Sequence, residues 1–225
     1  MSEKPILFNT EMVKAILEGR KTVTRRIVKI PKCIEKQENG LYTLCAEDSV
    51  YHDKGFGEIA EYIKMPYQIG DILYVRETWC DTSKDMRSSC DWDLGECKYI
   101  FKVDDNGKNQ LLIDLQVGRW RPSIHMPKSA ARIFLRVANV RVERLQDITT
   151  DDCMDEGVNR RTRIRLGYSA KESMEDFNNT QLKDTFKKLW DSTIKKGDIE
   201  TYGYKANPWV WVIKFERMEK SKGKS

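Results

Sequence analysis

The stretch ARIFLRVANVRVE, residues 131–143, decides the fold class. It is rich in the Ile, Val, Leu and Phe residues that favour strands. Its apolar residues occupy both faces, which is the pattern of a strand buried on both sides. A small closed barrel covered by a helix buries its strands in this way. We therefore predict a long strand over 131–143 in such a barrel.

Two further strands are predicted from shorter segments. Residues 70–79, GDILYVRETW, combine a Gly-Asp turn with a strand. Residues 209–217, WVWVIKFER, alternate with a period of two and follow an Asn-Pro turn at 207–208. One face of this last strand carries Trp209, Trp211 and Phe215. That spacing indicates a core position for the three aromatic side chains.

Short helices are predicted between the strands. Residues 10–18 have Thr10 as the expected N-cap and Gly19 as the stop signal. Residues 149–157 begin with threonines and aspartates and end in glycine, and residues 181–190 have apolar side chains at helical spacing. Strands mixed with a few short helices make the predicted fold class α+β.

The length of 225 residues fits one domain, 1–218, with a polar tail over 219–225. Segments at about 31–65, 81–128 and 158–180 carry turn residues and charge but little periodicity, so we expect irregular insertions with one hairpin.

A hydrophobic content of 40% with six Trp excludes global disorder. No apolar run approaches the roughly 20 residues that span a bilayer. We expect a cytoplasmic protein with no membrane partner, since the N-terminus lacks the apolar segment of a signal peptide.

The charge is only mildly basic. A net charge of +5 and a pI near 8.8 do not by themselves indicate nucleic-acid binding. The cations are clustered, however, and a cluster suits either a polyanion or a solvated face. One cluster comprises Arg119, Arg121, Lys128, Arg132, Arg136, Arg141 and Arg144, and a second comprises Arg160, Arg161, Arg163 and Arg165.

The sequence has few candidate metal ligands. The six cysteines form no C-x-x-C pair and the chain has only two histidines, so we predict no metal site and no cofactor. Without a secretion signal, the cysteines are interpreted as free thiols. The scarcity of His also argues against a Ser-His-Asp or Cys-His hydrolase. A catalytic base is therefore expected among the Lys, Asp and Glu residues.

The order of several motifs resembles a known family. The segment GRKTVTRR, residues 19–26, is followed by Gly-Asp-x-Leu-x-Val at 70–75, a barrel strand, Glu156 on a short helix and a final apolar strand. This order resembles the ASCH-domain family, which is similar to the PUA domain, an RNA-binding pseudo-barrel. The stretch RPSIHMPK, residues 121–128, resembles the longer, often prophage-encoded, ASCH proteins. The resemblance covers roughly half of the chain and implies a PUA/ASCH-like small β-barrel with short flanking helices and long insertions.

The resemblance also implies a chemistry. Some small ASCH proteins are amidohydrolases that remove the acetyl group from the exocyclic amine of acetylcytidine. Their catalytic Lys, Thr and Glu match Lys21, Thr24 and Glu156 of this chain. Asp152 and Asp155 are near competitors for the position of Glu156.

Physical chemistry is consistent with these roles. A Thr hydroxyl is a poor nucleophile until a base removes its proton. Lys21 can be that base only when neutral, so its pKa must fall from about 10.4 towards 7. Burial and the neighbouring cations Arg20, Arg25 and Arg26 push it in that direction. Arg26 stands where the family carries an Arg, and Arg25 and Arg26 are both expected to contact substrate. Glu156, near a helix C-terminus, suits a protonated acid that donates to the leaving amine.

A second set of candidate binding residues follows the Gly-Asp turn. Trp79 is expected to stack on a base, and Arg76 to bind a phosphate or a base edge beside Glu77. The alternative is a core tryptophan next to an Arg-Glu pair.

Functions from different classes stay open. The first is recognition of a modified nucleoside or RNA, with amidohydrolase chemistry at Lys21, Thr24 and Glu156 as its most concrete form. The second is a non-catalytic RNA- or DNA-binding module, regulatory and phage-associated. A closed pocket would favour the enzyme, and an open basic groove would favour the binding module. A third, weaker interpretation is an interaction protein whose insertions form a partner surface.

Overall fold

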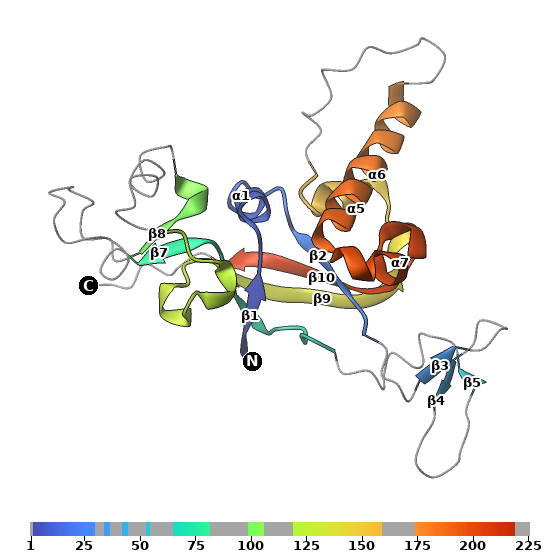
Figure 1. Cartoon of the computed structure of the whole chain (residues 1–225), viewed down its shortest axis with the longest axis horizontal. Helices are drawn as coiled ribbons and strands as arrows, with labels where there is room; N and C mark the ends of the chain where they lie inside the picture. Colours follow the sequence, from blue (N-terminus) through green and yellow to red (C-terminus); the bar gives the residue numbers. More distant parts are fainter. Residues whose placement is uncertain are drawn as a thin grey trace, which may run out of the picture. The chain divides into compact units, whose positions relative to one another are not determined.

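The computed structural model describes residues 2–29, 34–36, 42–44, 53–54, 65–81, 99–105, 119–158 and 174–218 (Figure 1). The strands are β1 (Glu3–Leu7), β2 (Val23–Ile27), β3 (Ile34–Lys36), β4 (Tyr42–Leu44), β5 (Asp53–Lys54), β6 (Ile72–Arg76), β7 (Trp79–Asp81), β8 (Tyr99–Phe101), β9 (Phe134–Arg144) and β10 (Trp209–Met218). The α-helices are α1 (Thr10–Leu17), α5 (Thr150–Asp155), α6 (Met174–Thr193) and α7 (Ile199–Tyr202). The short 3-10 helices are η1 (Lys102–Asp104), η2 (Ser123–His125), η3 (Lys128–Ala130), η4 (Leu145–Asp147), η6 (Lys196–Asp198) and η7 (Tyr204–Ala206).

The main sheet has five strands in the order β1-β6-β9-β10-β2. β1 pairs with β6 in parallel, while β6 pairs with β9, and β10 with β2, in antiparallel register. Two smaller antiparallel sheets are β3-β4-β5 and β7-β8. The predicted α+β class is therefore confirmed. No closed barrel is detected among the described strands, so the barrel stays a prediction.

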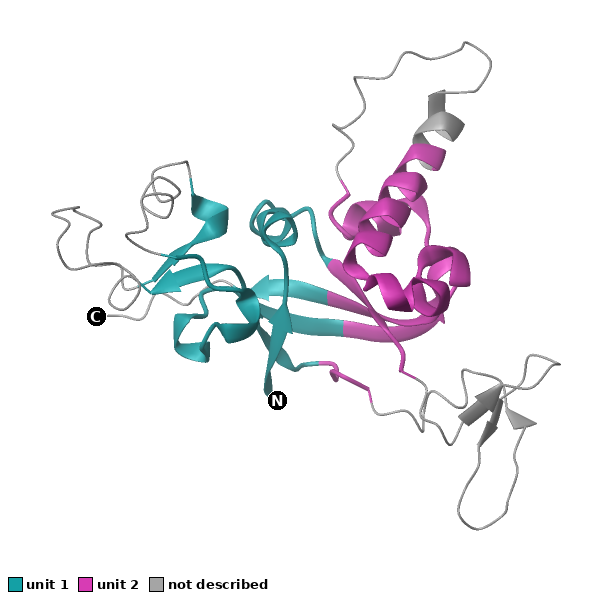
Figure 2. Ribbon diagram, viewed as in Figure 1, with its two compact units in different colours: residues 1–22, 70–138, 215–225 teal, residues 23–69, 139–214 magenta. Residues whose placement is uncertain are grey.

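The chain forms two compact units (Figure 2). Unit 1 comprises residues 1–22, 70–138 and 215–225, and unit 2 comprises residues 23–69 and 139–214. Each unit is a group of residues that contact one another. The predicted single domain over 1–218 stays a prediction. Of the predicted insertions, the first contains β3, β4 and β5, and large parts of all three lie outside the described residues.

Helix α1 in unit 1 was predicted to have Thr10 as its N-cap, and this was wrong. Asn9 is the N-cap, because its side-chain oxygen accepts the backbone N–H of Met12 at 2.9 Å. Thr10 is the first helical residue. The helix stops as predicted at Gly19, whose φ of 71° is the left-handed conformation that glycine adopts without strain.

Unit 1 also contains a cluster of buried apolar side chains around the β7-β8 sheet. Its buried members are Trp79, Phe101, Met126, Ala130 and Ala131. The partly buried Tyr74, Tyr99, Val103 and Phe134 pack against it. Apolar burial of this kind is the main stabilising contribution to a fold. The cluster therefore fixes the end of β6 and the start of β7, where three of the predicted binding residues lie.

Unit 2 packs helices against strands. Cys153 on α5, Leu182 and Phe186 on α6, and Val210 and Val212 on β10 belong to one buried cluster. α5 and α6 lie side by side (Figure 1). Helix α6 has 20 residues and starts before the predicted 181–190. The prediction missed its beginning because the sequence before residue 181, MEDFNNT, is polar and lacks a clear apolar period. Trp211 and Phe215 of β10 are 5% and 2% exposed, which confirms their predicted burial, whereas Trp209 is only half-buried.

Candidate functional site

Lys21 follows α1 in unit 1 and its side chain is buried. Its backbone N–H donates to the carbonyl of Ala15 at 3.1 Å, so Lys21 is hydrogen-bonded to the end of α1. Its ammonium nitrogen lies 5.8 Å from the ring centroid of Phe8, and that ring lies 6.2 Å from the ring of Phe215. A Lys among aromatic rings is an uncommon environment for a residue type that is almost never fully buried.

Thr24 lies on β2 in unit 2 and is 1% exposed. It pairs with Ile213 of β10 in the antiparallel register. No strand was predicted for residues 19–26, but residues 23–27 form β2. The strand was hidden because its side chains include charged groups that are buried in the fold rather than solvated.

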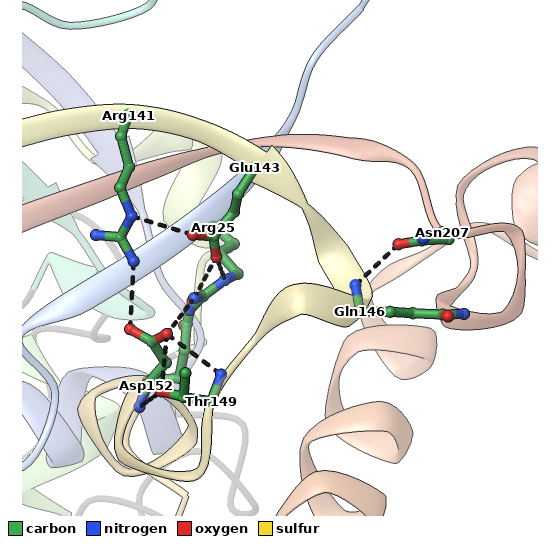
Figure 3. Close-up of polar contacts among 8 residues, drawn as sticks. Arg25, Arg141, Glu143, Gln146, Thr149, Asp152 and Asn207 are labelled. Carbon is green, nitrogen blue, oxygen red and sulfur yellow. Dashed lines mark hydrogen bonds and ion pairs between the residues drawn. The ribbon is translucent and has the colours of Figure 1, made fainter. Parts of the chain in front are cut away.

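Arg25, the next residue of β2, lies in a network of ion pairs (Figure 3). Its side chain is fully buried. Nε and NH2 donate to Glu143 Oε1 on β9, at 3.1 and 2.6 Å. NH2 also lies 3.3 Å from Asp152 Oδ2 on α5, and NH1 donates to Glu156 Oε1 at 3.2 Å. The guanidinium carbon lies 5.9 Å from the ring centroid of Phe186 on α6. Burial alone would lower the pKa of Arg25, but the three carboxylates together raise it.

Glu156 is the C-cap of α5 and is 5% exposed. The helix was predicted correctly: Thr149 is its N-cap and forms a capping box with Asp152, and Gly157 follows with φ of 89°. Burial would raise the pKa of Asp152, but Arg25, Thr149 and Arg141 hold it below its usual value. The structure thus brings Glu156 and Arg25, two of the predicted site residues, into direct contact.

Arg26 and Tyr67 form a further pair of interacting groups in unit 2. Burial lowers the pKa of Arg26, and Tyr67 and Glu156 partly oppose this effect. Burial raises the pKa of Tyr67, and Arg26 opposes that rise. Arg26 therefore lies within electrostatic range of Glu156 as well, so two consecutive arginines of β2 act on one carboxylate.

Arg76, Glu77 and Trp79 lie together in unit 1, but not as an Arg76–Glu77 pair. Arg76 donates to the backbone carbonyls of Met126 and Ile124, at 2.7 and 2.6 Å. Glu77 is 1% exposed and receives two hydrogen bonds from Arg132, at 2.9 and 3.0 Å. Burial raises the pKa of Glu77 and Arg132 opposes the rise only in part. Arg132 also pairs with Asp104 and lies 4.0 Å from the ring centroid of Phe101.

Trp79 is 4% exposed and packs in the unit 1 cluster. Its ring meets Tyr99 edge to face with centroids 5.6 Å apart, and the guanidinium of Arg121 lies 5.6 Å from it. The buried indole N–H has no hydrogen-bond partner among the residues that the structure describes. Base stacking on Trp79 therefore requires that its covering side chains move.

Several of the clustered cations make internal contacts. Arg121 contacts Trp79, Arg132 contacts Glu77, and Arg141 contacts Glu143 at 3.0 Å. Arg144 lies 4.2 Å from the ring centroid of Trp209. Their clustering in the sequence thus has a structural explanation. Residues 160–165, the second cluster, lie outside the described residues.

The described part of the chain offers little metal-binding or thiol chemistry. No group of three or more His, Cys, Asp or Glu residues that could hold a metal ion occurs within it. Cys80 and Cys153 are buried free thiols. Burial raises the pKa of Cys153 to about 11, so its reactive thiolate form is scarce near neutral pH.

Sequence reasoning missed Glu143 and Arg132 as parts of these networks. Each lies on or next to β9, far along the chain from the residue that it contacts. Arg25 and Glu143 are 118 positions apart, and Arg132 and Glu77 are 55 positions apart. The one available signal was a charged residue within an apolar strand segment, which indicates a buried pair only once the partner strand is known.

Comparisons with known proteins do not add an assignment. No protein-family model matches the chain, and no curated protein or solved structure matches it. None of the helices in the described residues combines the length and apolarity needed to cross a membrane.

Proposed function

We propose that this protein recognises a modified nucleoside or RNA and hydrolyses the acetyl amide of acetylcytidine. The proposal starts from the resemblance of the 19–26 segment and Glu156 to the ASCH amidohydrolases. One structural observation supports it most: the three residues with assigned roles are all buried. Lys21, Thr24 and Glu156 are 2%, 1% and 5% exposed. Buried ionisable groups are concentrated at functional sites because their burial costs free energy that function must justify.

The proposed reaction is an acyl transfer. Lys21 in its neutral form takes the hydroxyl proton of Thr24, and the Thr24 oxygen attacks the acetyl carbonyl. The amide C–N bond then breaks, and the amine leaves as cytidine after it receives a proton. Water hydrolyses the acetyl ester on Thr24, which regains its hydroxyl proton, and acetate and one proton are released. The sum is acetylcytidine plus water giving cytidine, acetate and a proton.

Glu156 has the proton-transfer role in this scheme. It was predicted in the protonated form. The structure adds Arg25, whose NH1 donates to Glu156 Oε1 at 3.2 Å. A guanidinium in that position is complementary to a carboxylate. We therefore propose that the Glu156 carboxylate takes over the proton that Lys21 removed from Thr24 and then delivers it to the leaving amine.

The test is release of cytidine from acetylcytidine by purified protein, followed by chromatography from about pH 6 to about pH 9. Thr24→Ala and Lys21→Ala should abolish release, whereas Thr24→Ser should retain part of it because the hydroxyl remains. The matched controls are Thr22→Ala in the same segment and Lys14→Ala at an exposed position of α1. Both controls should hydrolyse like the original chain.

The binding module is the alternative outcome of this experiment. If the unaltered chain releases no cytidine at high protein concentration, the amidohydrolase proposal fails. RNA binding would then be measured against salt concentration, since neutralised phosphates give a steep loss of affinity with salt. A single-stranded DNA of the same sequence would distinguish the two nucleic acids.

A further inference from the structure

The contacts of Arg25 are divided among its nitrogens. Nε and NH2 are occupied by Glu143 and Asp152, and NH1 is directed to Glu156. Glu143 and Asp152 are themselves held by Arg141, at 3.0 and 3.4 Å (Figure 3). A planar guanidinium fixed on one side in this way presents its remaining N–H groups in a defined direction.

The backbone of Glu156 is fixed separately from its side chain. Its N–H donates to the carbonyl of Asp152 at 2.9 Å, and the left-handed Gly157 ends the helix. These contacts set the position of the α-carbon but leave the carboxylate with three side-chain torsions. The side-chain contact to Arg25 at 3.2 Å restrains the direction of the carboxylate.

We propose that Arg25 is a positioning residue, which orients the Glu156 carboxylate for proton transfer. This inference rests on the proposed hydrolysis for its catalytic consequence, although the Arg25–Glu156 contact can be tested without it. Arg25 touches no reacting atom in this scheme. It acts through Glu156 alone, and Glu143 and Asp152 hold it in place.

Other charged groups surround the pair and are part of the same environment. Arg26 on β2 attracts Glu156, and Cys153 on α5 lies within electrostatic range of it. Arg141 on β9 reaches Glu143 Oε2 and Asp152 Oδ1. Arg136, an exposed residue of the same strand, provides a matched arginine for comparison.

The first experiment is a double-mutant cycle on the hydrolysis. Arg25→Gln should lower kcat by about 10²-fold with KM unchanged, because misplacing a catalytic group affects the reaction step rather than binding. In a Glu156→Gln background, Arg25→Gln should have no further effect on kcat. Arg136→Gln should change kcat little in either background. Equal losses from Arg25→Gln in both backgrounds would overturn the proposal, since Arg25 would then act through general stability.

Arg25→Lys guards against a variant that fails to fold. It keeps the charge but cannot donate to three carboxylates in a planar fork. We expect a folded protein with reduced kcat and unchanged KM. Full activity in Arg25→Lys would overturn the positioning role, because a point charge would then suffice.

A second measurement does not depend on activity. The carboxyl ¹³C resonance of Glu156 is identified in a labelled sample by its disappearance in Glu156→Gln. This signal should shift in Arg25→Lys and stay in place in Arg136→Gln. If the unaltered chain lacks hydrolase activity but the signal shifts, the proposed function fails while the contact stands. An unmoved signal in Arg25→Lys overturns the inference itself.

Discussion

Unit 1 and unit 2 each contain an arginine that bridges carboxylates beside a phenylalanine ring, and the two arrangements differ in burial. Arg25 of unit 2 has a fully buried side chain and reaches Glu143, Asp152 and Glu156. Arg132 of unit 1 is 28% exposed and, within the described part of the chain, forms ion pairs with Glu77 and Asp104. The comparison shows that the same arrangement of arginine and carboxylates should contribute differently to stability when water reaches one of the side chains.

The two networks differ in the number of buried carboxylates that lose their partner when the arginine is removed. Without Arg25, three carboxylates share a region from which water is largely excluded, and like charges repel strongly there. Without Arg132, only Glu77 is left buried, because Asp104 is 50% exposed. A single buried carboxyl can take up a proton to remove its charge, whereas three coupled carboxylates must take up several.

The largest expected effect is that of Arg25→Ala on stability. We expect the free energy of unfolding to fall by about 3–5 kcal/mol, the loss typical of a buried pair with one partner removed. Urea denaturation followed by circular dichroism measures this change. A loss below that of Arg132→Ala would mean that burial does not decide between the two networks.

Arg132→Ala should have a smaller effect, about 1–3 kcal/mol, because one buried acceptor loses its hydrogen bonds. Arg132→Lys restores a charge but not the two-point contact with Glu77, so it should recover part of the loss. The same denaturation experiment measures both variants. If Arg132→Lys were as stable as the original chain, the bidentate geometry would contribute nothing.

The sequence predicted elements that carry a regular apolar period or a cap. Helix α5 was found from its Thr start and Gly stop, and β10 from its alternation. β2 was missed because Thr24, Arg25 and Arg26 look like a solvated segment until their partners are known. Burial of a charged residue depends on contacts between distant segments, which a local pattern does not contain.

The same reason limits prediction of the candidate site. Residue types identified Lys21, Thr24 and Glu156 through a resemblance, and their burial emerged only from the fold. Arg25 was expected to contact substrate, but in the fold its guanidinium forms ion pairs with carboxylates of the protein itself. A sequence motif shows which chemical groups are present. Whether a group contacts the substrate or pairs with another side chain depends on the residues that surround it in the fold.

On acidification, the contributions of the two networks to the free energy of unfolding should change in opposite directions. The pKa of Asp152 is lowered from its ordinary 3.8, so its stabilising contribution is present above pH 3.8 and is lost as pH falls through the lower folded value. The pKa of Glu77 is raised from its ordinary 4.5, so its contribution is present below pH 4.5 and is lost as pH rises through the higher folded value.

This contrast is measured by urea denaturation of two variants from about pH 3 to about pH 8. Asp152→Asn should flatten the loss of stability on acidification. Glu77→Gln should flatten the loss of stability as pH rises above 4.5. Parallel pH profiles for both variants and the original chain would contradict the assignment of opposite shifts to these two carboxyls.

The smallest expected effect is that of Arg141→Ala, which removes the exposed member of the unit 2 network. Arg141 is 44% exposed, so solvent screens its pairs with Glu143 and Asp152. We expect a loss of about 0.2–1 kcal/mol that shrinks further in high salt, since screening weakens exposed pairs much more than buried ones. The loss from Arg25→Ala should change little with salt, because that side chain is fully buried. An equal salt dependence for the two variants would mean that water reaches Arg25 as readily as Arg141, and would remove the physical basis of the contrast between a buried and an exposed arginine.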